Sequence, residues 1–232
     1  MTYKIYIPRD SSSISLGAND VYQAVLNEAK KKNIDIEIVR NGSRGLFWLE
    51  PLIEVDTKNG RVAYGPVNVS DVPSLFDSKF YLGSKHPLCL GITEEIKWLK
   101  NQERLTYARV GIIDPLDIDE YEKLNGFNGL KNSIKLTPEN IVKEISDSGL
   151  RGRGGAAFPT GIKWKTVLDA PSDKKYIVCN ADEGDSGTFS DRMIMENDPF
   201  VLIEGMIIAG LAVGADQGHI YLRSEYPHAQ AI

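Results

Sequence analysis

Residues 176–222, YIVCNADEGDSGTFSDRMIMENDPFVLIEGMIIAGLAVGADQGHIYL, contain the pattern that decides the fold. The apolar run Tyr176–Cys179 predicts a buried strand of a parallel sheet. The almost continuously apolar segment 200–213 predicts a helix, and His219–Leu222 predicts a second strand. Together they form one β-α-β unit, which indicates the α/β class. One such unit cannot cover both faces of a parallel sheet. We therefore expect an incomplete domain, as a fragment, a truncated form or a polypeptide completed by another chain.

An acidic loop broken by glycines follows the first of these strands. Ligands bind where parallel strands end, so this loop is a candidate binding segment. Asp182, Glu183 and Asp185 would repel a phosphate group and suit ribose hydroxyls or the N–H edge of a heterocycle. A solvated turn or a divalent-metal site is the alternative interpretation. No histidine lies nearby, and the carboxylates lack the spacing of a calcium loop.

A second candidate segment is GLRGRGGAAFPTGIKW, residues 149–164, with five glycines and two arginines. Residues 152–157 satisfy the pattern G-x-G-x-x-A of dinucleotide-binding loops, but they follow a helix predicted over 137–150 rather than a strand. Adjacent glycines still allow a ligand close to the backbone, and Arg151, Arg153 and Lys163 add positive charge. A flexible surface loop is the alternative. A basic glycine loop and an acidic loop together favour a nucleotide ligand.

The amino-terminal part predicts a second, smaller α/β unit. Strands are expected over 3–8 and 34–40 with a helix over 18–33 between them. A hairpin follows, with Lys58-Asn59-Gly60 as its turn, and then a helix that begins with Ser70 as N-cap. The order β-α-β-β-α predicts a thioredoxin-like domain over residues 1–92. A connecting segment is expected over 93–135, and the first part of an incomplete Rossmann-like domain over 136–232. The helix after residue 136 is expected to have Thr137 as N-cap and Pro138 at its first position.

Composition excludes several classes of protein. The chain has 232 residues and a net charge of -5 without a basic block, which disfavours nucleic acid as a partner. The longest apolar stretch is shorter than a bilayer span, and the amino terminus lacks a secretory pattern. Cys89 and Cys179 are the only cysteines, too few to hold an iron–sulfur cluster, and no metal site is predicted. Free thiols favour a cytoplasmic location.

Three motifs resemble one protein family. GLRGRGGAAFPTGIKW, CNADEGDSGTFSDR and DPFVLIEGMIIAGLAVGA are similar to the flavin-bearing, NADH-oxidising subunit of respiratory NADH:quinone oxidoreductase and its relatives in NAD-dependent hydrogenases and formate dehydrogenases. The resemblance extends from about Gln102 to residue 232. The amino-terminal region and SDRMIMENDPF most resemble the beta subunit of soluble NAD-dependent formate dehydrogenase.

The resemblance implies FMN and NAD as cofactors. The FMN ligands that it implies are Gly152, Arg153, Gly154, Gly155, Lys163, Asn180, Asp182 and Glu183. NAD(H) is expected to stack near Phe158. Asp185 stands where many relatives carry a Glu that approaches the nicotinamide nucleotide, and its side chain is one methylene shorter. No side chain is assigned a catalytic role, because the flavin performs the bond chemistry.

The function that the resemblance implies is hydride exchange between NAD(H) and FMN, with electrons passed to or from iron–sulfur clusters. The expected partners are iron–sulfur and catalytic subunits of a multisubunit oxidoreductase, without membrane insertion. A [4Fe-4S] cluster is expected only in a carboxy-terminal region that relatives carry beyond this sequence. Ser43 and Phe47 stand where relatives have cluster cysteines, so the first domain is expected to hold no cluster. The parent complex that the resemblance implies is an NAD-dependent formate dehydrogenase. The alternatives are a non-catalytic assembly or binding remnant of such a subunit, or the equivalent module of an NAD-reducing hydrogenase or respiratory NADH dehydrogenase.

Overall fold

The computed structural model describes residues 2–232, and the chain divides into two compact units. The first runs to Glu120 and includes Glu196–Asp198 and Ile232; the second comprises Tyr121–Met195 and Pro199–Ala231. These limits differ from the predicted boundaries at residues 92 and 135. Most of the predicted connecting segment belongs to the first unit, where Arg104 donates to the Arg44 carbonyl at 2.7 Å and Asn41 donates to the Gly111 carbonyl at 2.7 Å.

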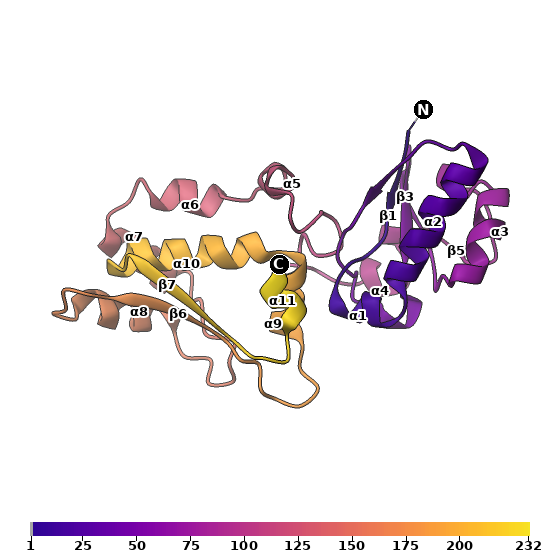
Figure 1. Cartoon of the computed structure of the whole chain (residues 1–232). Coiled ribbons are helices and arrows are strands. Elements are labelled where there is room, and N and C mark those ends of the chain that lie inside the picture. The colour runs from indigo at the N-terminus through magenta and orange to yellow at the C-terminus, as the bar shows by residue number, and fades with distance from the viewer. Residues whose placement is uncertain (1) are drawn as a thin grey trace. The chain divides into compact units, whose positions relative to one another are not determined.

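A five-stranded sheet forms the centre of the first unit (Figure 1), with the strand order β2-β1-β3-β4-β5. β1 and β2 are parallel and the other neighbours are antiparallel. The strands are β1 Tyr3–Tyr6, β2 Ile36–Val39, β3 Ile53–Thr57, β4 Gly60–Tyr64 and β5 Cys89–Ile92. The helices of this unit are α1 Ser11–Ser15, α2 Ala18–Lys32, α3 Val72–Asp77 and α4 Lys97–Lys100, with 3-10 turns η1 Phe47–Leu49, η2 Val69–Asp71, η3 Phe80–Leu82 and η4 Thr93–Glu95.

Helix α2 packs on this sheet through one apolar stripe. Val21, Val25 and Ala29 are buried at helical spacing and join a core that includes Ile5 and Phe76. The helix ends at Lys32, and the left-handed backbone of the next residue, Asn33 (φ 54°), caps its last turn. The predicted β-α-β order of this part is confirmed.

Two details of the predicted turns need correction. In the β3–β4 hairpin, Lys58 and Asn59 form the loop, and Gly60, with φ +113°, is the first residue of β4 and pairs with Thr57. Ser70 is not an N-cap, because it lies inside η2. Asn68 caps that turn instead, and Asp71 completes the capping box by accepting from the Asn68 N–H at 2.8 Å.

The second unit contains one parallel strand pair, β6 Tyr176–Ala181 and β7 Gln217–Leu222, joined through α9 Ser190–Asn197 and α10 Pro199–Val213 (Figure 1). This confirms the predicted β-α-β unit and the mixed α/β class. The remaining helices are α5 Ile118–Lys123, which spans the boundary, α6 Asn128–Ser133, α7 Pro138–Asp147, α8 Thr160–Asp169 and α11 Pro227–Ala231.

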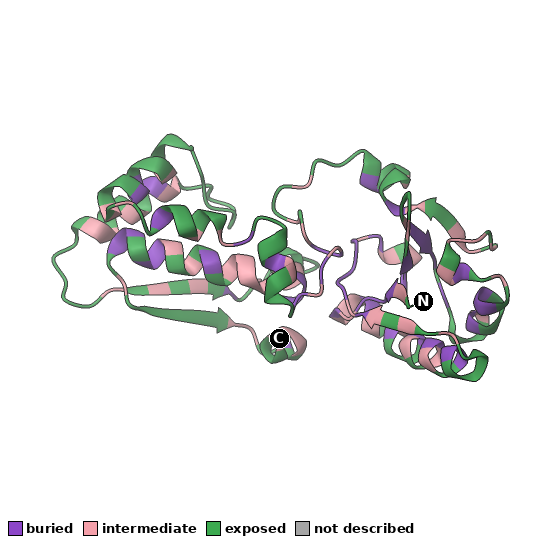
Figure 2. Cartoon of the chain, turned by 90° about the horizontal axis from the view of Figure 1, so that it is seen from above, coloured by how far each residue is buried: buried purple, intermediate pink, exposed green. Residues whose placement is uncertain are grey.

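β6 is not buried as predicted. Ile177 packs with α7, α8 and α10, and Cys179 packs with Leu202 of α10. On the opposite face, Val178 is 63% exposed and Tyr221 of β7 is 66% exposed. Figure 2 shows the exposed positions along both strands. Side chains alternate between faces along a strand, so covering one face of β6 leaves its other face in contact with solvent, whereas β7 is exposed at every position from Gln217 to Tyr221.

Helix α10 is apolar on every side, yet it buries Glu204. The carboxylate accepts hydrogen bonds from the backbone N–H groups of Phe127 at 2.8 Å and Leu130 at 2.9 Å, and from the Tyr121 hydroxyl. Phe127 precedes α6, so Glu204 satisfies the first N–H groups of a helix more than 70 residues away. This contact fixes α6 against α10.

Helices α7 and α8 approach each other closely at Gly161. A Cβ atom at Gly161 would lie 2.1 Å from Oγ and 2.7 Å from Cα of Ser146. The predicted start of α7 is confirmed: Pro138 is its first residue, and the Thr137 hydroxyl accepts from the Asn140 N–H at 3.4 Å. Because α8 carries Lys163, this helix pair determines where that lysine lies.

Candidate functional site

The glycine loop is a closed backbone loop between α7 and α8. Arg151 and Pro159 form an antiparallel bridge at its base. The Gly152 N–H donates to the Phe158 carbonyl at 2.8 Å, and the Arg151 Nε donates to the Ala157 carbonyl at 2.6 Å. These bonds give the loop a defined base and leave its tip exposed.

The tip of this loop leaves space beside the backbone. Gly154 and Gly155 are exposed, and a Cβ atom added at either would meet no other atom of the chain within 4 Å. Gly155 also has φ +92°, a conformation that favours glycine. A ligand can therefore approach the backbone here more closely than at a residue with a side chain.

The acidic loop begins at the end of β6. Asn180 is the last residue but one of this strand, and its side-chain oxygen accepts from the Asp182 N–H at 3.2 Å. Asp182 and Asp185 are exposed. The β6 and β7 strands are parallel, so both end at the same edge of the sheet, where ligands of α/β proteins bind.

One cavity of about 690 Å³ joins the two loops, and all of its lining residues belong to the second unit. Its volume lies within the usual range of small-molecule sites. The predicted residues that line it are Arg153, Gly154, Gly155, Lys163, Asn180, Asp182, Glu183 and Asp185. Gly152 and Phe158 do not line it: Gly152 belongs to the base of the loop, and Phe158 is half exposed.

Four further residues line this cavity: Gly184, Thr188, Ser190 and Asp191. They were not among the predicted site residues, although all lie within the acidic motif. Their position depends on how the loop folds back onto the start of α9, which the spacing of charges does not reveal. The signal available in the sequence was Gly184, a glycine between the acidic residues Glu183 and Asp185.

The cavity lining combines opposite charges that come from different segments of the chain. Arg153 and Lys163 come from the glycine loop and α8, whereas Asp182, Asp185 and Asp191 come from the acidic loop and α9. The basic residues suit an anion beside exposed backbone, and the acidic residues suit hydroxyl and N–H groups. This arrangement matches a ligand with a phosphate at one end and a polar ring or sugar at the other.

Glu183 has a different environment from the neighbouring carboxylates. It accepts from the Ser190 hydroxyl at 2.9 Å, the N–H groups of Asp191 at 2.9 Å and Arg192 at 3.1 Å, and the Tyr226 hydroxyl at 3.0 Å. Burial by itself would raise the pKa of Glu183, but these donors outweigh it and hold the pKa below its usual range. The carboxylate therefore caps α9.

Cys179, beside this loop, is a half-buried thiol whose pKa is raised by burial and by the nearby Asp191 carboxylate. A raised pKa keeps the thiol protonated and reduces its reactivity. This environment agrees with the interpretation of Cys179 as a small apolar strand residue.

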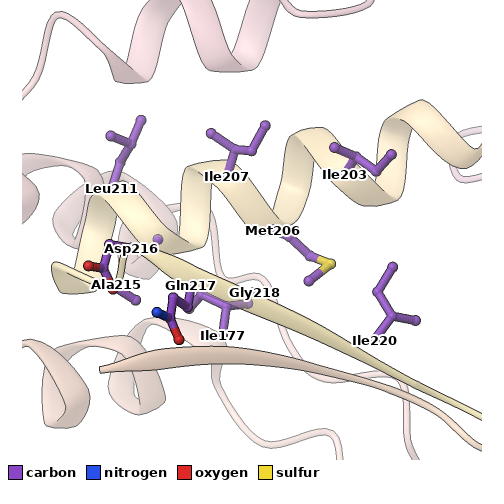
Figure 3. A pocket seen from close by; sticks show the side chains of 11 residues that line it. Ile177, Ile203, Met206, Ile207, Leu211, Ala215, Asp216, Gln217, Gly218 and Ile220 are labelled. Atoms are coloured by element: carbon purple, nitrogen blue, oxygen red, sulfur yellow. The ribbon is translucent and has the colours of Figure 1, made fainter. Parts of the chain in front are cut away.

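The second unit also has an apolar groove of about 370 Å³ beside β7 and α10 (Figure 3). Ile203, Ile207 and Leu211 of α10 line it together with Ile220 of β7, and Asp216 is its one charged lining residue. Without several convergent polar groups, this groove does not suit a nucleotide.

The positions where cluster cysteines were considered lie in the first unit. The Ser43 side chain is buried, and its hydroxyl donates to the Glu50 carboxylate; Phe47 begins η1. Within residues 2–232, no three His, Cys, Asp or Glu side chains come together as metal ligands. Over the same residues, no helix is both long enough and apolar enough to cross a bilayer.

Comparison with known proteins identifies the segment that carries the cavity. Residues 145–232 match the family model of the Nuo51 FMN-binding domain. The NADP-reducing hydrogenase subunit HndC of Solidesulfovibrio fructosivorans is 50% identical over 130 residues, which are 56% of this chain and 26% of that protein. One subunit of the NADH-quinone oxidoreductase of Aquifex aeolicus is 51% identical over 110 residues, 47% of this chain and 26% of that protein.

The chain spans about a quarter of the length of these two relatives. Among solved structures, the chain is similar to an air-oxidised NAD+-reducing [NiFe]-hydrogenase, with 22% identity and a TM-score of 0.41. The alignment covers 99% of this chain and 39% of the hydrogenase chain. A TM-score this low does not assign the fold. The FMN and NAD predictions are confirmed by the FMN-binding domain match and the NADH-linked relatives.

Proposed function

We propose that the second unit binds FMN in the 690 Å³ cavity and that the chain is part of a module that exchanges hydride between NAD(H) and FMN. The observation that carries this proposal is the single cavity formed by the basic glycine loop and the acidic loop. The match of residues 145–232 to an FMN-binding domain supports it.

The phosphate end of FMN is assigned to the glycine loop. Gly154 and Gly155 give access to the backbone, and Lys163 and Arg153, which line the same cavity, supply positive charge. Gly152 contributes indirectly, since its N–H closes the base of the loop through the Phe158 carbonyl.

The polar ring or ribityl end is assigned to Asn180 and Asp182, whose side chains can accept from N–H or hydroxyl groups. Asp185, on the same wall, is proposed to contact the nicotinamide nucleotide, and the half-exposed ring of Phe158 is proposed to stack against it. When bound, FMN supplies the centre that accepts or donates hydride. The protein aligns the two ligands and surrounds them with fixed polar groups.

The finer fold assignments belong to the same proposal. The first unit is proposed to be thioredoxin-like, which its order β2-β1-β3-β4 and its one parallel pair support. The second is proposed to be part of a Rossmann-like domain, supported by the parallel β6–β7 pair and the α10 crossover.

Formate is our first proposal for the electron donor of the parent complex, and it rests on the resemblance of the amino-terminal region. The named relatives are subunits of a hydrogenase and of NADH-quinone oxidoreductase, which favours those two complexes as the second candidates. In each case the proposed partners are iron–sulfur and catalytic subunits, and the proposed location is the cytoplasm.

The test is reconstitution of the chain with FMN, followed by NADH-dependent reduction of a dye. We expect one FMN per chain and a bound-flavin absorption spectrum. Dye reduction above that of free FMN supports the diaphorase function. Stoichiometric FMN without dye reduction favours the non-catalytic alternative, and the absence of FMN binding contradicts the proposed site.

A further inference from the structure

We infer that Tyr226 and Arg223 are positioning residues that hold the acidic loop in its ligand-binding shape through Glu183. This inference rests on the proposed function, because it concerns the same FMN cavity. It gives Glu183 a role different from direct contact with the flavin, and it assigns roles to two residues that do not line the cavity.

The first observation is that both carboxylate oxygens of Glu183 have donors within the protein. Oε1 accepts from the Ser190 hydroxyl and the Asp191 N–H, and Oε2 accepts from the Arg192 N–H and the Tyr226 hydroxyl. The first turn of a helix carries N–H groups without helical partners, so this carboxylate satisfies the start of α9. A ligand would have to displace these donors to bind Glu183.

The second observation is that residues beyond β7 hold Glu183 from the other side. Tyr226 is buried, and its hydroxyl lies 3.0 Å from the carboxylate and 3.4 Å from the Thr188 carbonyl. Arg223 donates from Nη1 to the Glu183 carbonyl at 2.5 Å, and its guanidinium lies 5.1 Å from the Tyr226 ring centre. The turn after β7 therefore binds the backbone and the side chain of one acidic-loop residue.

The third observation concerns the backbone at Glu183. This residue has φ 38°, a left-handed conformation that costs energy for a residue with a side chain. Its neighbours Asp182 and Gly184 both line the cavity. The contacts of Tyr226 and Arg223 hold this conformation, so they determine the direction in which Asp182 faces the ligand.

The experiment uses the full chain with Tyr226→Phe, which removes the hydroxyl and keeps the ring. Tyr176→Phe is the matched control, since Tyr176 lies at the opposite end of β6 and is 47% exposed. Two quantities are measured: amide hydrogen exchange of residues 182–192 without FMN, and FMN affinity with the visible absorption spectrum of the bound flavin. Thermal unfolding reports whether each variant keeps its fold.

We expect Tyr226→Phe to accelerate exchange of the Asp191 and Arg192 amides and to weaken FMN binding by about tenfold, the scale of one hydrogen bond to a charged group. The flavin spectrum should shift, because Asp182 no longer faces the ring in the same way. Arg223→Lys should give a smaller change in the same direction, since it keeps the charge and loses the planar donor group.

The outcomes separate this inference from the proposed function. Faster exchange with unchanged FMN affinity and spectrum overturns the positioning role and leaves Glu183 as a helix cap. Unchanged amide exchange in both Tyr226→Phe and Arg223→Lys overturns the claim that these two side chains hold Glu183. If the wild-type chain binds no FMN, the proposed function fails and the inference fails with it. An equal loss of affinity in Tyr176→Phe also contradicts the inference.

Discussion

Ser43 and Glu50 form a buried hydrogen bond in which the Ser43 hydroxyl donates to the Glu50 carboxylate at 2.5 Å. The Leu52 N–H donates to the same carboxylate at 2.8 Å. Burial, with a smaller contribution from the Asp10 carboxylate, raises the pKa of Glu50 to about 7 against the lowering effect of these two bonds. The native first unit therefore holds a carboxyl group that titrates near neutral pH.

We expect Glu50 to make stability fall as pH rises from about 4.5 to about 7. In that range the folded chain keeps a proton that the unfolded chain releases, so unfolding becomes more favourable with increasing pH. The shift corresponds to roughly 3 kcal/mol at most. Urea unfolding at pH 5 and pH 8 measures it, and Glu50→Gln should reduce the difference between the two pH values. An equal difference in the variant would assign the effect to other groups.

Replacement of Gly154 by Val is expected to abolish FMN retention with little change in stability. The new Cβ meets no atom of the chain within 4 Å, so it fills space reserved for the ligand. Gly205→Val is the control, because Gly205 is also exposed and also has no atom within 4 Å of an added Cβ, but lies in α10 away from the cavity. Flavin content after gel filtration measures the difference. Full retention by the Gly154 variant would remove the glycine loop from the site.

Lys163→Ala is expected to weaken FMN binding by about 10- to 150-fold, the effect of losing one charge-assisted hydrogen bond of about 1.5–3 kcal/mol. Lys165→Ala is the matched control on the same helix, where the Lys165 ammonium pairs with Asp169 outside the cavity. Fluorescence titration with FMN and with riboflavin gives the comparison. If the loss is equally large for riboflavin, Lys163 does not contact the phosphate.

Glu204→Ala is expected to destabilise the second unit by about 3 kcal/mol or more, because it removes the acceptor shared by the buried Tyr121 hydroxyl and the partly buried N–H groups of Phe127 and Leu130. Thermal unfolding should shift downward by more than about 10 °C. Glu122→Ala is the control: its exposed pair with Lys131 contributes about 1 kcal/mol or less. Equal thermal unfolding midpoints for Glu204→Ala and Glu122→Ala would show that the Glu204 contacts make no net contribution to stability.

The sequence predicts the local parts of this molecule and misses the contacts between distant segments. Thr137 and Pro138 identify the start of α7, because a cap and its helix are adjacent in the chain. Glu204 interrupts an apolar run without showing that its partner Tyr121 lies 83 residues earlier. Charge and glycine content identify both loops of the cavity.

The role of Glu183 as the cap of α9 could not be predicted in the same way. It depends on a backbone turn and on Tyr226, 43 residues later in the chain. In sequence, Glu183 is one of three neighbouring acidic residues with the same chemistry. Only the folded loop distinguishes Glu183, whose carboxylate accepts hydrogen bonds from the protein, from the exposed carboxylates of Asp182 and Asp185.

The close contact between Gly161 and Ser146 makes the cavity sensitive to residues outside it. Since α8 rests on α7 at this point, a larger side chain at position 146 or 161 would push α8 outward and carry the Lys163 ammonium away from Gly154 and Gly155. Substitutions at the α7–α8 contact are thus expected to change affinity for the anionic end of the ligand while the glycine loop itself stays unchanged. A mutational screen for altered cofactor retention should recover substitutions at Ser146, a residue that does not line the cavity.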